Sequence, residues 1–482
     1  MKIFFSILIT AIVLSSCEKQ LEEKPQSIAA EVFYNTNAEV EAGLNAIYEP
    51  VRGTGSIGAL YPAQLEIYTE YFYGRGSHAP LNTYTGLDNT NISRIAGFWT
   101  LFYRAIRNAN IVISRLPEAA EVSADAQKRY MAEAKYMRAL WYFHLVRNWA
   151  GVPLRTEANF DSINVKRSSE QEVYDFIVSD LSVAVTDLPE APRLIGAPSR
   201  WAAKTLLADV YMHLDKYAEA RKEALDVIQS NRFGLVPVTT SDDFENVFGP
   251  EVNNSLEEIF YIKYSNKIDG QGNTYPQYTH YPNSGYYPPG GFYTLYSDSE
   301  NNQFLKNWDK NDLRYAFNWY TQTFGLGSTT VLNKKFSDKT ATLAAGNDFP
   351  LYRYADVLLF YAECDARVAG NVTTDALEKL NMVHRRAYGK PAEMPDPATD
   401  ILMADVPSLN AFVSRVVTER AYENMNEAKH WFDLKRLGIV KQTIQDQKGI
   451  AVQDKHLLWP IPTDEYNYNL AINPATDQNP GY

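Results

Sequence analysis

The amino-acid sequence predicts a mostly α-helical fold, built on helical hairpins of the tetratricopeptide type and carrying a large, irregular, aromatic-rich insertion. Three observations support this class. Apolar side chains recur at helical spacing both before residue 230 and after residue 350. Residues 200–229 have the spacing of a tetratricopeptide hairpin. Residues 231 to about 349 are rich in Gly, Pro, Asn and Tyr and show few long helical faces.

Helical periodicity dominates the first half of the chain. Each predicted helix carries apolar residues three or four positions apart. The predicted helices are Asn37 to Tyr48, Ser93 to Leu116, Asp125 to Trp149, Glu170 to Leu188, Arg200 to Leu214 and Tyr217 to Gln229. Small Ala208 and Ala220 let the last two helices approach closely, and Asp356 to Arg386 is a looser copy of this pair. One good match and one loose match favour helical hairpins over a regular solenoid.

The N-terminus is typical of an exported protein. A basic start is followed by an apolar run and then by Leu14-Ser15-Ser16-Cys17. The run is shorter than the roughly 20 residues of a membrane-spanning helix, so residues 1–16 are predicted to be a cleaved signal peptide. Leu-Ser-Ser-Cys resembles the bacterial lipobox and predicts lipidation of Cys17; the alternative is a secreted protein whose early Cys is incidental. Residues 17–35 are predicted to be a tether and residues 36–482 a single domain.

Composition limits the partners of the chain. The formal charge is −12 and the pI is about 5.2, so phosphate backbones would repel the protein and nucleic acid is not expected as a partner. Membrane attachment is predicted only through lipid on Cys17. The second cysteine, Cys364, falls on the apolar stripe of a helix and is predicted to be a core residue.

No motif for catalysis, metal binding or cofactor binding occurs with the spacing and context that it requires, so the chain is not predicted to be an enzyme. Residues 53–58 match G-x-G-x-x-G, but they follow a helical stretch, whereas the dinucleotide site needs a preceding strand. The seven histidines show no spacing typical of metal ligands. Residues 309–312 offer oxygens to a calcium ion without completing a ligand loop. We therefore expect no cofactor and no metal.

The irregular insertion is enriched in aromatic residues. They make up 17 of the 64 residues from Tyr261 to Phe324, about 27%, against 13% over the whole chain. Exposed aromatic surface is unfavourable in water unless something covers it. Either this segment packs on the helical body, or it presents aromatic rings to a ligand.

Several stretches in the second half of the chain resemble signature motifs of the SusD/RagB family of outer-membrane nutrient-binding lipoproteins. They are residues 353–363 (RYADVLLFYAE), 380–387 (LNMVHRRA), 419–436 (with ERAYE and HWFDLKR), 458–462 (LWPIP) and 478–482 (QNPGY). Trp99, Arg107 to Asn110 and Ala134 to Trp149 are similar to the N-terminal helices of the family. One departure is Tyr422-Glu423-Asn424, where Phe-Glu-Gly is common, and it concerns packing.

The resemblance implies a function in nutrient capture. Family members sit as a lid on a SusC-like TonB-dependent transporter and deliver oligosaccharides, or sometimes peptides, to it. The implied location is the outer membrane, lipid-anchored at Cys17 and facing the cell exterior. Two alternatives stay open: the same scaffold binding peptides or another organic nutrient, and an adaptor that only gates the transporter.

The resemblance also implies where the ligand binds, namely an arc of aromatic residues on the irregular region helped by a loop near the N-terminal helices. Sugar rings stack on aromatic faces, while their hydroxyls need amide or guanidinium partners. The candidate residues are Tyr286, Tyr287, Tyr293, Trp308 and Trp319 in the insertion and Tyr73, Arg75 and His78 in the N-terminal loop. The charged signature residues Arg353, Asp356, Glu363, Arg420 and Asp433 are predicted to pair inside helix contacts instead.

Overall fold

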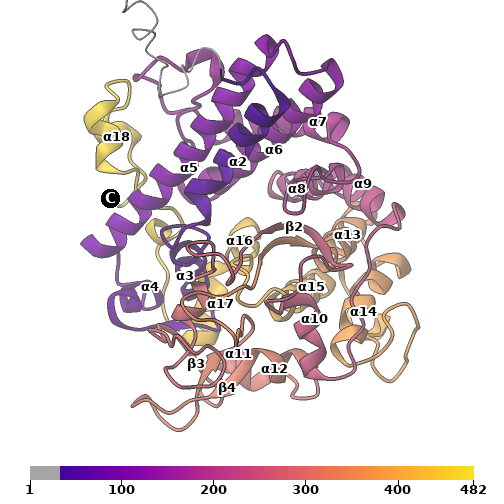
Figure 1. The fold of residues 1–482 in the computed structure, drawn as a ribbon. Helices are drawn as coiled ribbons and strands as arrows, with labels where there is room; N and C mark the ends of the chain where they lie inside the picture. The colour runs from indigo at the N-terminus through magenta and orange to yellow at the C-terminus, as the bar shows by residue number, and fades with distance from the viewer. Residues whose placement is uncertain (1–32) are drawn as a thin grey trace, which may run out of the picture.

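The computed structural model describes residues 33–482 and shows a mostly helical molecule with a few short strands (Figure 1). This confirms the predicted class, a mostly α fold with an irregular insertion. The predicted signal peptide at 1–16, the lipidation site Cys17 and most of the tether at 17–35 lie outside the described residues. No helix between residues 33 and 482 is long and apolar enough to cross a bilayer.

Long helices form the N-terminal part of the fold. They are α2 (Asn37–Arg52), α5 (Asn89–Arg115), α6 (Ala124–Trp149) and α7 (Glu170–Asp187), with the short α3 (Leu60–Ile67) and α4 (Ala79–Asn82) between the first two. The four long helices pack on one another in chain order (Figure 1). Each begins after a Thr, Asp or Ser whose side chain accepts a hydrogen bond from the first turn, which satisfies a backbone N–H that the helix leaves free.

Helical hairpins follow, and the first of their helices packs on α7. α8 (Arg200–His213) and α9 (Tyr217–Gln229) form the predicted pair, and the small residues predicted at their contact are buried. α9 also packs on α13 (Tyr354–Ala369), which packs on α14 (Thr374–Ala387). This arrangement fits the expected tetratricopeptide-like hairpins. Cys364 is fully buried on α13, which confirms its prediction as a core residue.

The C-terminal part consists of shorter helices that return across the molecule. They are α15 (Leu409–Glu423), α16 (His430–Arg436), α17 (Val440–Lys448), α18 (Thr463–Tyr468) and α19 (Pro474–Asp477). α15 packs on α13, and α16 contacts α3 from the N-terminal part. In Figure 1 α18 lies beside α5, away from α15, α16 and α17, and its Glu465 accepts a hydrogen bond from the indole N–H of Trp99 on α5 at 3.4 Å.

The insertion holds short helices and most of the strands. The helices are α10 (Glu245–Phe248), α11 (Gln303–Asn307) and α12 (Leu313–Asn318). Strand β2 (Glu258–Ile262) pairs antiparallel with β6 (Phe349–Arg353). A second sheet has the order β1-β3-β5-β4, formed by β1 (Tyr73–Gly74), β3 (Leu295–Asp298), β5 (Thr330–Asn333) and β4 (Trp319–Thr321). Its edge strand β1 comes from the N-terminal part, so this sheet joins two distant regions of the chain.

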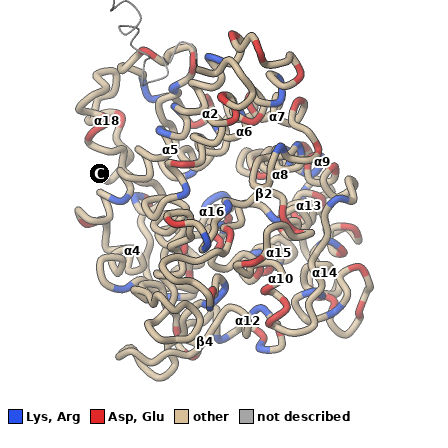
Figure 2. Tube along the Cα trace, viewed as in Figure 1, with Lys and Arg blue, Asp and Glu red and all other residues tan. Residues whose placement is uncertain are grey.

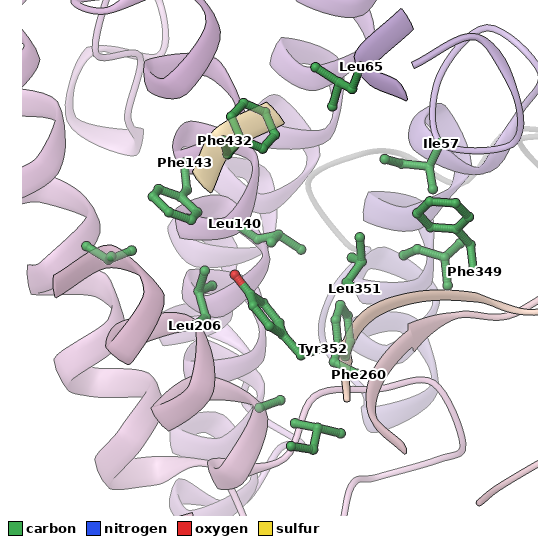
Figure 3. Close-up of a cluster of buried hydrophobic side chains, with 14 of the residues drawn as sticks. Ile57, Leu65, Leu140, Phe143, Leu206, Phe260, Phe349, Leu351, Tyr352 and Phe432 are labelled. Atoms are coloured by element: carbon green, nitrogen blue, oxygen red, sulfur yellow. The ribbon is translucent and has the colours of Figure 1, made fainter. Parts of the chain in front are cut away.

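One continuous cluster of buried apolar side chains connects the N-terminal helices, the insertion and the C-terminal helices. Figure 3 shows part of it, where Leu140 of α6, Leu206 of α8 and Phe432 of α16 lie around Tyr352 of β6. The Tyr352 hydroxyl donates to Asp209 at 2.7 Å, so its polar end is satisfied inside the core.

A buried network of charges joins the insertion to the C-terminal helices. Arg353 is fully buried, and its guanidinium lies 3.0 Å from Glu257, 2.7 Å from Glu423 and 2.7 Å from Glu427. Figure 2 shows acidic and basic positions close together where β2, α15 and α16 meet. The other charged signature residues are also paired, as Asp356–Lys429, Glu363–Arg436 and Arg420–Asp433. Their predicted structural pairing is thereby confirmed.

Candidate functional site: an aromatic surface on the insertion

The N-terminal loop joins the insertion through strand pairing. β1 runs antiparallel to β3 with Tyr73 opposite Tyr296, and the two rings have centroids 5.5 Å apart. The N–H of Arg75 continues the pairing by donating to the carbonyl of Thr294 at 3.0 Å. Backbone pairing thus fixes the position of the predicted loop residues against the insertion.

Arg75 covers an aromatic ring of the insertion. Its guanidinium carbon lies 3.9 Å from the ring centroid of Tyr293 and 5.6 Å from that of Phe324. The negative face of an aromatic ring attracts a guanidinium at this distance. Within residues 33–482 no acceptor takes a hydrogen bond from Nη1 of Arg75. Nη1 is itself buried, so protein atoms enclose this donor.

Aromatic contacts continue from Tyr293 across the neighbouring loops. The Tyr281 ring lies 4.6 Å from Tyr293 and stacks on Phe324 at 5.7 Å between centroids. The backbone N–H of Tyr281 donates to the Tyr320 hydroxyl at 3.0 Å. The Tyr320 ring in turn lies 4.7 Å from Tyr286. Two groups of rings, one around Tyr293 and one around Tyr286, are therefore joined by this hydrogen bond.

We call these residues together the aromatic surface. It consists of Tyr73, Arg75, Tyr281, Tyr286, Tyr293, Tyr296, Tyr320 and Phe324, each of which is partly exposed. Segments 271–297 and 319–333, which supply all but the first two, contain no Lys, Arg, Asp or Glu. In Figure 2 the chain around β4 is accordingly almost free of charged positions. The surface combines ring faces and phenol hydroxyls with one guanidinium.

Two residues remote in sequence hold the backbone that enters β1. Lys448, the last residue of α17, donates from Nζ to the carbonyls of Thr69 at 2.5 Å and Phe72 at 2.6 Å. Asn302 donates from Nδ2 to the carbonyl of Glu70 at 2.8 Å. Burial lowers the pKa of Lys448 to about 7, because an ammonium group loses hydration there. The aromatic surface thus depends on contacts with the C-terminal helices.

Two predicted site residues, His78 and Tyr287, are buried and do not belong to the aromatic surface. The His78 ring centroid is 5.9 Å from that of Tyr278. Burial lowers the pKa of His78 to about 3, so its imidazole is neutral at physiological pH. Tyr287 is fully buried and its hydroxyl donates to the carbonyl of Leu343 at 3.1 Å. In this conformation both residues support loops.

Two other predicted site residues, Trp308 and Trp319, are core residues. Trp308 is 1% exposed, its indole N–H donates to Asp312 at 2.9 Å, and its ring stacks on Tyr422 with centroids 4.3 Å apart. Trp319 is 5% exposed, and its ring lies 5.3 Å from that of Phe72. Protein atoms cover both indoles, so neither presents a ring face to a ligand, and the site we propose does not include them.

Four members of the aromatic surface were not among the predicted residues, namely Tyr281, Tyr296, Tyr320 and Phe324. The available signal was the aromatic enrichment of the insertion, which marks the region but not the residues. Which rings reach the surface depends on the strand order β1-β3-β5-β4. Short strands separated by irregular loops give no periodicity from which to infer that order.

Metal-ligating side chains do not gather at this surface. Between residues 33 and 482, no three His, Cys, Asp or Glu side chains come together in a way that would hold a metal ion. Asp312, from the segment considered for calcium, instead pairs with the buried Arg314 at 2.7 Å. The chemistry available at the aromatic surface is therefore ring stacking and hydrogen bonding.

Comparisons with known proteins agree with the architecture. A family model described as "Starch-binding associating with outer membrane" matches residues 19–212, and the model described as "SusD family" matches residues 293–482. Among curated proteins, SusD-like protein P38 of Formosa agariphila is 27% identical over 100% of this chain and 98% of its own length. SusD-like protein P25 of the same organism is 25% identical over 97% of both chains.

Solved structures show the same fold. A SusD homolog from Bacteroides thetaiotaomicron has a TM-score of 0.79 at 20% identity, covering 94% of this chain and 98% of its own. A SusD superfamily protein from Parabacteroides distasonis has a TM-score of 0.73 at 25% identity, covering 92% and 99%. A laminarin-binding SusD-like protein has a TM-score of 0.73 at 22% identity, covering 93% and 100%. Motifs, family models and fold together show that this chain belongs to the SusD/RagB family.

Proposed function

We propose that the protein binds oligosaccharides at the aromatic surface and delivers them unchanged to a SusC-like TonB-dependent transporter in the outer membrane. The observation that carries this proposal is the geometry around Arg75, whose guanidinium lies 3.9 Å from the Tyr293 ring centroid amid partly exposed, uncharged aromatic residues. Non-catalytic capture fits this surface, because its chemistry is ring stacking and hydrogen bonding.

The chemistry of the surface suits a sugar chain. The C–H faces of pyranose rings pack on aromatic rings, and sugar hydroxyls accept hydrogen bonds from a guanidinium or exchange them with phenols. Tyr281, Tyr293 and Phe324 offer such rings within 6 Å of one another, with centroid distances of 4.6, 5.7 and 5.0 Å. Strand pairing and Lys448 hold the loop that carries Arg75, so little ordering is required on binding.

Relatives support a carbohydrate ligand. The family model that matches the N-terminal part is described as starch-binding, one structural neighbour as laminarin-binding, and another as surface glycan-binding protein A from Bacteroides thetaiotaomicron. Export and anchoring are supported by the sequence alone, through the signal-like residues 1–16 and the lipobox-like Leu14 to Cys17. The transporter partner is proposed from family membership.

Calorimetry with a panel of glycans and peptides tests the proposal. Residues 18–482 are titrated at high ligand concentration, since a Kd near 1 mM corresponds to only about −4 kcal/mol. We expect saturable binding of at least one glycan. Tyr293→Ala should weaken this binding, and Tyr468→Ala, a change at a residue 74% exposed outside the aromatic surface, should leave it intact.

Other outcomes would contradict the proposal in defined ways. Peptide binding without glycan binding would support the alternative nutrient on the same scaffold. A complex with the transporter but no affinity for either class would support the adaptor alternative. Hydrolysis of a bound glycan with turnover would overturn non-catalytic capture.

A further inference from the structure

A groove separate from the aromatic surface lies where α2 meets the insertion. It has a volume of about 850 Å³ and is lined by the last turns of α2, the turn at 53–54, and insertion segments 264–272 and 342–344. None of the eight side chains of the aromatic surface lines it. Its volume falls in the range of roughly 300–1,000 Å³ that is typical of small-ligand sites.

About half of the residues that line the groove carry amide, hydroxyl or phenol groups. Its amide and hydroxyl residues are Asn45, Thr54, Ser265, Asn266, Gln271, Thr274 and Thr342, and its aromatic residues are Tyr48 and Tyr264. The carbonyl oxygens of Asn45 and Gln271 accept hydrogen bonds from Arg193 and Arg52. Among residues 33–482 no acceptor takes a hydrogen bond from the NH₂ groups of these two amides. Both amides therefore keep donor capacity for a ligand.

Arg52 fixes the wall of the groove. Its guanidinium donates to the Gln271 side chain at 2.5 Å and to the carbonyl of Lys263 at 2.6 Å. The Tyr264 hydroxyl donates to the Arg52 carbonyl at 2.9 Å, and the guanidinium carbon lies 5.3 Å from the Tyr264 ring centroid. These contacts tie the insertion to the end of α2, so the groove is formed before a ligand arrives.

The charges of the groove favour a neutral ligand. Its cations are Arg52 and Lys267 and its anions are Glu49 and Asp269, so the lining carries no formal net charge. Lys267 already pairs with Glu251 at 2.6 Å, and Glu49 pairs with Arg104 at 3.3 Å. A charged ligand would have to compete with these pairs, whereas a polyhydroxylated neutral one needs only the amides and hydroxyls.

We propose that this groove is a second carbohydrate-binding site, which takes a short neutral oligosaccharide alongside the aromatic surface. The inference rests on the proposed function, since it assigns the same ligand class to a second place. Sugar hydroxyls match the free amide donors of Asn45 and Gln271. The Tyr264 ring is 9% exposed and supports the groove wall through Arg52. Two sites on one chain would hold a long glycan at two points and raise its apparent affinity through avidity.

A side chain placed at Gly53 tests the groove. Gly53 lines it with φ −67°, and a Cβ built there meets no atom within 4 Å. Gly53→Trp can therefore fill the groove without backbone strain. Gly97→Trp is the matched control, because Gly97 on α5 also has no atom within 4 Å of a built Cβ and does not line the groove. Asn45→Ala with Thr342→Ala is a second groove variant that adds no bulk.

Hydrogen exchange locates each site. The full-length chain, in a non-glycosidic detergent, is measured with and without saturating maltohexaose or laminarihexaose. We expect slower exchange in segments 264–272 and 281–297 for the unmodified protein. Gly53→Trp and the double Ala variant should lose the protection at 264–272 alone, and Tyr293→Ala should lose that at 281–297 alone.

The outcomes separate the two assignments. Protection confined to 281–297 and unchanged in Gly53→Trp would overturn the second site and leave the proposed function standing. Protection confined to 264–272 and lost in Gly53→Trp would support the groove and contradict the role of the aromatic surface. Protection in neither segment with either sugar would overturn both, and loss of it in Gly97→Trp would show that the effect is not specific to the groove.

Discussion

The Nζ of Lys448 lies 2.6 Å from the carbonyl oxygen of Phe72, so the end of α17 holds the backbone that leads into β1. The same group also donates to Thr69. Tyr73 and Arg75, which contribute to the aromatic surface, follow directly along the chain. A residue that touches no proposed ligand thus positions part of the proposed site.

Lys448→Met should loosen this segment. The substitution retains an apolar stem but leaves two carbonyls without their donor, at a cost of about 1–3 kcal/mol for each buried group that stays unsatisfied. We expect faster hydrogen exchange over residues 69–75 and weaker glycan binding, with little change in exchange on α6. Lys441→Met, on the same helix at a position 51% exposed, is the control and should change neither quantity. Equal exchange in both variants would contradict the positioning role.

Arg75 and Tyr293 should contribute to glycan affinity as a coupled pair. Changing either residue to Ala removes its own contact with the ligand and also the packing of Arg75 on the Tyr293 ring. A cation–π contact of this kind is worth about 0.5–2 kcal/mol. We therefore expect each single variant to bind about 2- to 30-fold more weakly than the unmodified protein. The loss of affinity in the double variant should be smaller than the product of the two single losses. Calorimetry on the unmodified protein, the two single variants and the double variant gives a double-mutant cycle. If the loss of affinity in the double variant equalled the product of the two single losses, the coupling would be contradicted.

The helices could be predicted from the sequence because their signals are local. The apolar spacing of α5 and α6 lies within one segment of the sequence, and so do Asp88 and Ser123, which cap these helices. The candidate site was predicted only in part, since Tyr73 and Tyr296 meet through pairing of strands of two and four residues. Trp308 shows why the site could not be predicted fully. Its stacking partner Tyr422 comes from α15, and no local sequence pattern predicts that contact.

Trp308→Ala should act on stability. The side chain is 1% exposed and stacks on Tyr422, so its loss opens a cavity in the core. Changes of this type cost about 3–5 kcal/mol. We expect a large decrease in the free energy of unfolding, measured by urea denaturation, while the fraction that stays folded binds glycan with unchanged affinity. A large loss of affinity in protein shown to be folded would return Trp308 to the site.

Glu66→Gln should change how stability depends on pH. Glu66 is fully buried on α3, where its carboxylate accepts a hydrogen bond from the Ala428 backbone at 2.5 Å. Burial raises the pKa of Glu66 from 4.5 to about 7. The folded state therefore holds a proton on Glu66 that the unfolded state releases, so the stabilisation from protonation is complete below pH 4.5 and is lost as pH rises toward 7.

Glutamine resembles the protonated carboxyl and does not titrate, so the variant should lack the pH-dependent part of the stability that comes from protonation of Glu66. We expect the stability of the unmodified protein relative to Glu66→Gln to fall by about 3 kcal/mol between pH 4.5 and 7, since one pKa unit corresponds to about 1.4 kcal/mol. Urea denaturation at a series of pH values measures the difference, in which all other titrating groups cancel. Glu118→Gln, at a side chain 77% exposed, should show a constant difference and serves as the control. A constant difference for Glu66→Gln as well would mean that the buried carboxylate is ionised throughout this range and is stabilised by His430 and Lys335, whose charges oppose the effect of burial.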